Sequence, residues 1–291
     1  MILGATGRIG RPLVREVRHQ GAAVVAVSRS SQHAEQDKVR WVALSPDDVE
    51  GQRKIFERAD AIIDARNQRY DDWSAYPAMI RTTLSALGQS GVPYTYVDNV
   101  YGYGRPHGDS VKEDAPRLPV SRKGRYRVEV EGLLFRAVES GRRVQIVRFP
   151  DFYGISTDSL GQGFLRWFGP PILAHQFIHI PDAAHAAWLL TSDSEAPSGV
   201  WHVAGDSPIA AEPLREIAQS ALKRPVRLRV FPCLAVAAAG MANPQIRGLV
   251  ETQYLWRTPL ALNTEKFESR YGTEFRHSHQ YALEEICAAI L

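Results

Sequence analysis

The chain opens on a glycine-rich turn, Gly4-Ala5-Thr6-Gly7-Arg8-Ile9-Gly10, between a short apolar run and an amphipathic stretch. This order predicts a strand, a turn and a helix. Glycines permit the turn and let a pyrophosphate approach the backbone at the positive end of the helix. The spacing alone is a weak signal, since an ordinary glycine-rich turn can share it, but its place between strand and helix favours a dinucleotide site.

A continuous apolar run at 22–27 predicts a second strand, buried on both faces, which ends in Ser28-Arg29-Ser30. At this strand end an acid binds the free 2′-hydroxyl of NAD, whereas an arginine accommodates the 2′-phosphate of NADP. The sequence has no acid there and places Arg29 between two hydroxyls, which favours NADP(H) over NAD(H). Arg29 as a solvated loop charge is the alternative, and Arg8 is either a second phosphate contact or a surface residue.

Apolar runs and helical stretches alternate through the first half of the chain. Further strands are predicted at 39–44, 60–65, 93–98 and 143–149, and helices near 52–58, 73–90 and 122–140. This rhythm predicts an α/β fold with a Rossmann-type doubly wound parallel sheet. We expect an NAD(P)-binding core over 1–153, and a region over 154–291 that completes it and forms a smaller C-terminal substrate-binding lobe.

The carboxyl ends of the predicted strands locate the expected site, because ligands of open α/β sheets bind there. Ala65 and Arg66 are expected to contact the cofactor, and Asn99, Asp151 and Tyr153 the substrate. The alternative for Asp151 is that it fixes a loop.

Composition excludes several classes of function. The 291 residues include 35 basic and 32 acidic ones, a net charge of +3 that is too balanced to indicate nucleic-acid binding. No apolar stretch approaches the ~20 residues of a membrane-spanning helix, and the chain enters its first strand without a signal peptide. Two distant cysteines fit a reducing, cytoplasmic setting. No metal site is expected: His175 and His179 bracket a predicted strand, and His277 belongs to no visible constellation.

Four segments together resemble the extended short-chain dehydrogenases/reductases of the NAD-dependent epimerase/dehydratase group. They are the glycine turn, Val100-Tyr101-Gly102, Arg148-Phe149-Pro150-Asp151-Phe152-Tyr153-Gly154 and Ile180-Pro181-Asp182-Ala183-Ala184. The resemblance covers nearly the whole chain. It implies a catalytic Ser or Thr where this sequence has Val97, and a Tyr-x-x-x-Lys pair that this sequence lacks. The best alignment places Lys123 at the Tyr position and Arg127 at the Lys position.

These departures leave three hypotheses open. In the first, the protein reduces or isomerises a small carbonyl compound: Tyr101 or Lys123 supplies the proton, Arg127 holds the nicotinamide ribose, and Asp98 lies beside them. In the second, the fold binds NADP without redox turnover, as a regulator or sensor. In the third, a non-redox isomerase or lyase uses Asp98 as a base. Structural roles are the alternative for each residue: Asp98 caps a turn, and Tyr101 and Tyr103 pack a loop.

The apolar segment 231–256 carries few charges. Core packing of the smaller lobe is its simpler interpretation, and a lid over an apolar or aromatic substrate is the other. The resemblance also implies a homodimer formed through the helices at 73–90 and 122–140.

Overall fold

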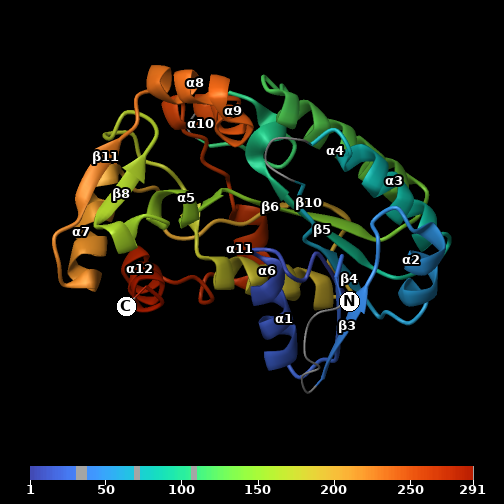
Figure 1. Cartoon of the computed structure of the whole chain (residues 1–291). Helices are drawn as coiled ribbons and strands as arrows, with labels where there is room; N and C mark the ends of the chain where they lie inside the picture. The colour runs from blue at the N-terminus through green and yellow to red at the C-terminus, as the bar shows by residue number, and fades with distance from the viewer. Residues whose placement is uncertain (31–37, 69–72, 106–109, 291) are drawn as a thin grey trace. The chain divides into compact units, whose positions relative to one another are not determined.

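The computed structural model describes residues 1–30, 38–68, 73–105 and 110–290, which form two compact units (Figure 1). Unit 1 consists of Met1–Asp98, Arg125–Arg148 and Ala183–Trp201. Unit 2 consists of Asn99–Gly124, Phe149–Asp182 and His202–Leu291. Each unit is assembled from three separate stretches of chain, whereas the boundary predicted after residue 153 follows chain order.

Unit 1 is built on a seven-stranded sheet in the order β10-β6-β5-β4-β1-β2-β3. The strands are β1 (Ile2–Leu3), β2 (Val24–Ser28), β3 (Val39–Ala43), β4 (Ile62–Asp64), β5 (Tyr94–Asn99), β6 (Val144–Phe149) and β10 (Gly199–His202). β1 pairs in parallel with β2 and with β4, so the strand order reverses beside β1. This is the topological switch point at which doubly wound folds bind their ligands.

Helices cover both faces of this sheet (Figure 1). They are α1 (Gly10–His19), α2 (Val49–Phe56), α3 (Tyr76–Leu87), α4 (Arg122–Glu139) and α6 (Ile180–Ser192), the last two of which begin in unit 2. His185 of α6 lies 2.7 Å from the Glu16 carboxylate of α1, which marks these two helices as neighbours. Arg81 of α3 and Glu129 of α4 form an ion pair at 2.5 Å. The predicted α/β fold with a doubly wound parallel sheet is confirmed.

Hydrophobic patterning explains why these residues form these elements. All six residues of β6 are buried, as expected of a strand covered by helices on both faces. In α1 the buried Leu13, Val14 and Val17 form a single stripe, while the other face is charged. The carboxylate of Asp48 accepts a hydrogen bond from Gly51 N at 2.8 Å and caps the start of α2.

Unit 2 contains two small parallel pairs of strands and several short helices. Its elements are η1 (Val100–Tyr103), β7 (Asp151–Phe152), α5 (Gly154–Thr157), η2 (Leu160–Gln162), β8 (Phe164–Trp167), β9 (Phe177–Ile178), α7 (Ala211–Leu222), β11 (Arg227–Val230), α8 (Cys233–Ala242), α9 (Pro244–Val250), α10 (Gln253–Arg257), α11 (Glu265–Tyr271) and α12 (His279–Ala288). β7 pairs with β9 and β8 pairs with β11.

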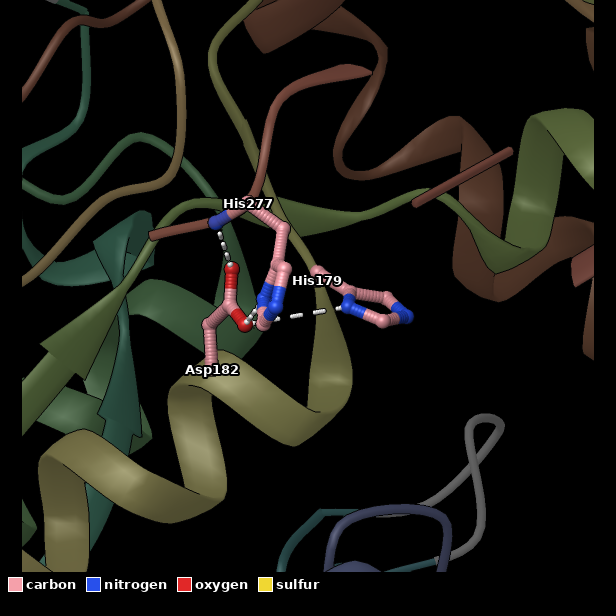
Figure 2. Close-up of side chains that lie close together, drawn as sticks. All are labelled: His179, Asp182 and His277. Carbon is pink, nitrogen blue, oxygen red and sulfur yellow. Dashed lines mark hydrogen bonds and ion pairs between the residues drawn. The ribbon is translucent and has the colours of Figure 1, made fainter. Parts of the chain in front are cut away.

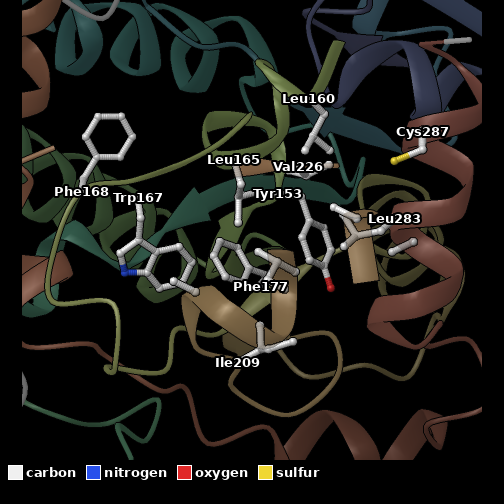
Figure 3. Packing of buried hydrophobic residues seen from close by; sticks show 14 of the residues in the cluster. Tyr153, Leu160, Leu165, Trp167, Phe168, Phe177, Ile209, Val226, Leu283 and Cys287 are labelled. Carbon is white, nitrogen blue, oxygen red and sulfur yellow. The ribbon is translucent and has the colours of Figure 1, made fainter. Parts of the chain in front are cut away.

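An aromatic core holds unit 2 together (Figure 3). The Trp167 ring meets Trp256 edge-on at 5.2 Å, and the Tyr153 ring stacks on Phe177 at 5.2 Å. Such pairs add about 0.5–1.5 kcal/mol each beyond the area they bury. Unit 2 therefore has a core of its own, and it is not the smaller of the two units.

The apolar segment 231–256 forms α8, α9 and most of α10. Val236 and Trp256 are buried in the core, as the packing interpretation predicts. Leu234 and Met241 are instead 86% and 77% exposed, so the segment has a buried and an exposed side. In the described part of the chain, no helix has both the length and the hydropathy needed to cross a membrane.

Candidate functional site

The glycine turn between β1 and α1 is shaped by close contacts between backbone segments. Gly4 has a φ of +78°, and a Cβ there would lie 2.8 Å from Arg66 Cα. A Cβ on Gly10 would lie 2.1 Å from the carbonyl oxygen of Gly4. Only glycine fits both positions, because in each case a side chain would collide with backbone. Both glycines let backbone segments pack closely, as a turn that binds a pyrophosphate requires, and the residues present fit that group.

The start of α1 leaves room for an anion. Its N-cap residue, Ile9, offers no capping hydrogen bond, and the first turn holds no acidic residue. The N–H groups at such an end point outward and carry a partial positive charge. The glycine turn at 4–10 thus leads into a helix whose first turn has no side-chain cap and no acidic residue.

The end of β2 carries Ser28, Arg29 and Ser30. Ser28 is buried, and its hydroxyl donates to the carbonyl oxygen of Ser30 at 2.5 Å. This bond fixes the turn that follows the strand, and Arg29 and Ser30 are exposed. The backbone that carries the exposed Arg29 side chain is thus held in place by this bond.

Ala65 and Arg66 follow β4, beside the glycine turn. Ala65 is buried, and the Arg66 guanidinium contacts both oxygens of Asp64, at 2.9 and 2.5 Å. Burial opposes charge on Arg66, but the Asp64 carboxylate outweighs it and raises the Arg66 pKa. The guanidinium of Arg66 is thus bound by Asp64, and the backbone of Arg66 lies next to Gly4.

A buried charge cluster lies deeper in unit 1. Arg148 donates to Asp98 Oδ2 from Nε at 3.0 Å and from Nη2 at 2.6 Å, and to Glu131 Oε2 at 2.9 Å. Arg127 Nη1 lies 3.3 Å from Asp98 Oδ1. Asp98, predicted as a catalytic group, is therefore enclosed by two guanidinium groups.

Aromatic rings surround Arg127 as well. Its guanidinium lies 4.5 Å from the ring centre of Tyr76 and 4.7 Å from that of Trp73, and it donates to the Tyr96 hydroxyl. Burial raises the Tyr96 pKa well above its ordinary value, although the Arg127 charge opposes this rise. Arg127 thus has a defined place inside unit 1, and its predicted contact with a nicotinamide ribose stays a prediction.

Lys123, Asn99 and Tyr101 belong to unit 2. The Lys123 ammonium is buried and donates to the carbonyl oxygen of Gly248 at 2.6 Å. Asn99 accepts from Tyr101 N at 3.1 Å and so caps η1, while Tyr101 is 9% exposed. The Tyr103 hydroxyl lies 2.6 Å from His202 Nε2, which supports the structural role expected of Tyr103.

Asp151 and Tyr153 also lie in unit 2. Burial raises the pKa of Asp151 to about 6. Tyr153 is 2% exposed, and its hydroxyl lies 2.6 Å from His279 Nδ1. Tyr153 is thus a core residue, and the substrate contacts predicted for it and for Asp151 stay predictions.

Sequence reasoning missed two groups. Arg148 organises the buried cluster, and its signal is a charged residue inside the largely apolar run 144–149. The expectation that His277 belongs to no constellation is wrong, because His179, Asp182 and His277 lie together (Figure 2). The spacing of His179 and Asp182 by three residues was a local signal, whereas His277 is 95 residues from Asp182 and gave none.

Comparisons with known proteins agree with this geometry. Residues 4–118 match the model of an NAD(P)H-binding family. A dTDP-6-deoxy-L-talose 4-dehydrogenase (NAD(P)(+)) from Kitasatospora kifunensis is 31% identical over 153 residues, which are 48% of each protein. The chain thus spans about half the length of this curated relative.

Solved structures match the chain over nearly its whole length. A dTDP-glucose 4,6-dehydratase from Bacillus anthracis str. Ames, in complex with NAD, has a TM-score of 0.78 and 12% identity, and the match covers 99% of this chain and 94% of the other. A UDP-glucuronic acid 4-epimerase from Bacillus cereus, in complex with UDP-glucuronic acid and NAD, has a TM-score of 0.77 and 12% identity, with 99% and 98% covered.

Residues 4–118, which include the glycine turn at the switch point, thus resemble an NAD(P)H-binding family. Over nearly its whole length the chain shares the fold of the dTDP-glucose 4,6-dehydratase and of the UDP-glucuronic acid 4-epimerase. The resemblance drawn from its motifs is confirmed.

Proposed function

We propose that this protein binds NADP(H) and reduces or isomerises a small carbonyl compound. The observation that carries the proposal is the glycine cradle: Gly4 and Gly10 have no room for a Cβ, and α1 begins without a cap. Glycines at these positions are what the turn of a dinucleotide-binding fold requires, because they allow close packing and let a pyrophosphate approach the backbone. The dinucleotide supplies a hydride when bound, and the chain must supply binding, orientation and a proton.

The preference for NADP(H) over NAD(H) rests on the end of β2. Arg29 is exposed on a turn fixed by the Ser28 hydroxyl, and the segment 28–30 carries no acid. A hydrogen bond to a charged group contributes about 1.5–3 kcal/mol, which corresponds to roughly 10- to 100-fold in affinity. We therefore expect NADPH to bind at least ~10-fold more tightly than NADH.

The chain must also supply a proton to the substrate. Tyr101 and Lys123 are the candidates, because a phenol and a buried ammonium can both protonate the alkoxide that a reduced carbonyl leaves. Lys123 already donates to Gly248 O, and Tyr101 belongs to a one-turn helix capped by Asn99. Both stay candidates, and the substitutions Tyr101→Phe and Lys123→Ala would assign the donor.

The relative from Kitasatospora kifunensis acts, by its name, on a dTDP-linked deoxysugar. That likeness supports a sugar-nucleotide substrate, whereas the apolar segment 231–256 supports an apolar or aromatic one. Because Val236 and Trp256 of this segment are used in the core, it offers less apolar surface to a ligand than the sequence suggests. Both substrate classes therefore belong in the test.

A second function, binding of NADP(H) without turnover, is favoured by a specific observation. Val97 occupies the position of the family's catalytic hydroxyl, and Arg127 is enclosed by Asp98 and aromatic rings. The third hypothesis, a base at Asp98, loses support, because Arg148 and Arg127 flank both oxygens of that carboxylate.

The test is a fluorescence titration with NADPH and NADH, followed by turnover assays. The panel holds dTDP-6-deoxy-L-talose with NADP⁺, and aliphatic and aromatic ketones with NADPH. Turnover that falls in Tyr101→Phe while NADPH binding is kept would support the reductase or isomerase. Tight binding without turnover over the panel would support the regulator, and failure to bind either nucleotide would overturn the proposal.

A further inference from the structure

The cluster of His179, Asp182 and His277 lies wholly in unit 2, whereas the glycine turn belongs to unit 1. His179 directly precedes α6, Asp182 lies in the first turn of that helix, and His277 directly precedes the Ser278 cap of α12. The three side chains converge (Figure 2), and their nearest nitrogen and oxygen atoms all lie within 4.8 Å of one another.

The contacts within this cluster are unequal. Asp182 Oδ1 lies 2.6 Å from His277 Nδ1 but 3.7 Å from His179 Nδ1. A separation of 3.7 Å is too long for a hydrogen bond. His179 is 5% exposed, and within the described residues its buried Nδ1 has no hydrogen-bond partner. A buried nitrogen left in this way costs stability, so an ion at this position would compensate it.

We propose that His179, Asp182 and His277 bind a divalent transition-metal ion of the Zn²⁺ type. Metal–nitrogen and metal–oxygen bonds of about 2.0–2.2 Å in tetrahedral geometry place two ligand atoms roughly 3.4 Å apart. The separation of His179 Nδ1 from Asp182 Oδ1 is already close to that value. His277 must move its Nδ1 away from Asp182 by somewhat less than ~1 Å and lose the proton on that atom.

The chemistry of the donors selects the class of ion. Two imidazoles with one carboxylate suit Zn²⁺, Co²⁺ or Ni²⁺, whereas Mg²⁺ and Ca²⁺ prefer oxygen ligands throughout. The His277 side chain is 42% exposed, so an ion could enter from solvent and keep a water as its fourth ligand. The site therefore has an entry path and an open position.

Neighbouring side chains would support the ligands. His179 Nε2 lies 3.7 Å from the Glu285 carboxylate, and carboxylates commonly orient metal-binding imidazoles through the second ring nitrogen. The Tyr281 ring stacks on His277 with centroids 4.1 Å apart, which limits rotation of the imidazole. The partial positive charge at the starts of α6 and α12 opposes a cation, but Asp182 and Glu285 supply two negative charges against it.

Binding would join two parts of unit 2 that lie far apart in sequence. Asp182 and His277 are separated by 95 residues, and an ion bound only by the folded chain stabilises the fold by mass action. We expect Zn²⁺ to raise the unfolding midpoint of unit 2, independently of nucleotide binding by unit 1.

The experiment uses untagged, full-length protein treated with a chelator. Zn²⁺ is titrated by calorimetry at pH 7.5, and Co²⁺ by its visible absorption. We expect one ion per chain, and affinity at least ~10-fold weaker in His277→Gln and His179→Gln. The control is His19→Gln, an exposed histidine at the end of α1, which should bind as the wild type does.

His277→Gln decides the outcome if His179→Gln misfolds, because His277 is partly exposed. The proposal is overturned if no stoichiometric Zn²⁺ or Co²⁺ binding occurs, or if binding persists unchanged in His277→Gln. NADPH affinity, measured in the same samples, reports separately on the proposed function.

Discussion

Replacing Arg148 by methionine tests whether the buried charge cluster of unit 1 is a structural element. The Arg148 side chain is fully buried and contacts Asp98 and Glu131 at 2.6 and 2.9 Å. Methionine is apolar and unbranched but shorter than arginine, so the substitution removes the charge and leaves a small space that adds to the loss. In the variant, Asp98 keeps its ion pair with Arg127 at 3.3 Å. Glu131, which is 5% exposed, loses its ion pair with Arg148.

Removing one member of a buried ion pair costs about 3–5 kcal/mol, because an uncompensated charge stays in the interior. The matched control is Arg81→Met, which breaks an arginine–glutamate pair of 2.5 Å whose side chains are 55% and 45% exposed. An exposed pair of this kind contributes at most about 1 kcal/mol. The two substitutions are chemically identical and differ mainly in burial.

Urea unfolding measures both variants against the wild type, with the transition followed by circular dichroism. At a slope of about 2–3 kcal/mol/M, Arg148→Met should lower the midpoint by roughly 1–2 M and Arg81→Met by less than ~0.5 M. Equal small losses in the two variants would refute the reasoning.

Three further predictions concern the glycine turn, the cofactor and pH. Gly10→Ala should abolish NADPH binding, because its Cβ would collide with Gly4 O, while Gly91→Ala, with open space around it, should bind normally in the same titration. Arg29→Ala should weaken NADPH binding roughly 10- to 100-fold and leave NADH binding nearly unchanged. An equal loss of affinity for both nucleotides would contradict a contact between Arg29 and the 2′-phosphate. Burial lowers the pKa of His175 to about 4. The neutral imidazole is therefore compatible with folding above pH 6.5, and about 3 kcal/mol of stability is lost as the pH falls from 6.5 towards 4. Stability measured over this range should fall less steeply in His175→Gln, and parallel curves would contradict the prediction.

The sequence by itself determined the fold class and the glycine turn. Both depend on local order: apolar runs, helical periodicity and glycines at fixed spacing along a few dozen residues. Six strands of the sheet and the glycine turn with Gly4 and Gly10 follow from these signals, whereas β10 was not predicted. The end of β2 could be assigned in the same way, because Ser28-Arg29-Ser30 directly follows an apolar run.

Only the tertiary structure decided how the charged and titratable side chains are paired. Arg148 meets Asp98 across 50 residues of sequence, and His277 meets Asp182 across 95. No local pattern encodes such pairs, since strand order and helix packing bring the partners together. The burial of Asp98 and Arg127 between arginine, carboxylate and aromatic groups likewise depends on that packing. Local sequence patterns thus determine the strands, helices and turns, whereas the surroundings of each charge are set by contacts between distant segments.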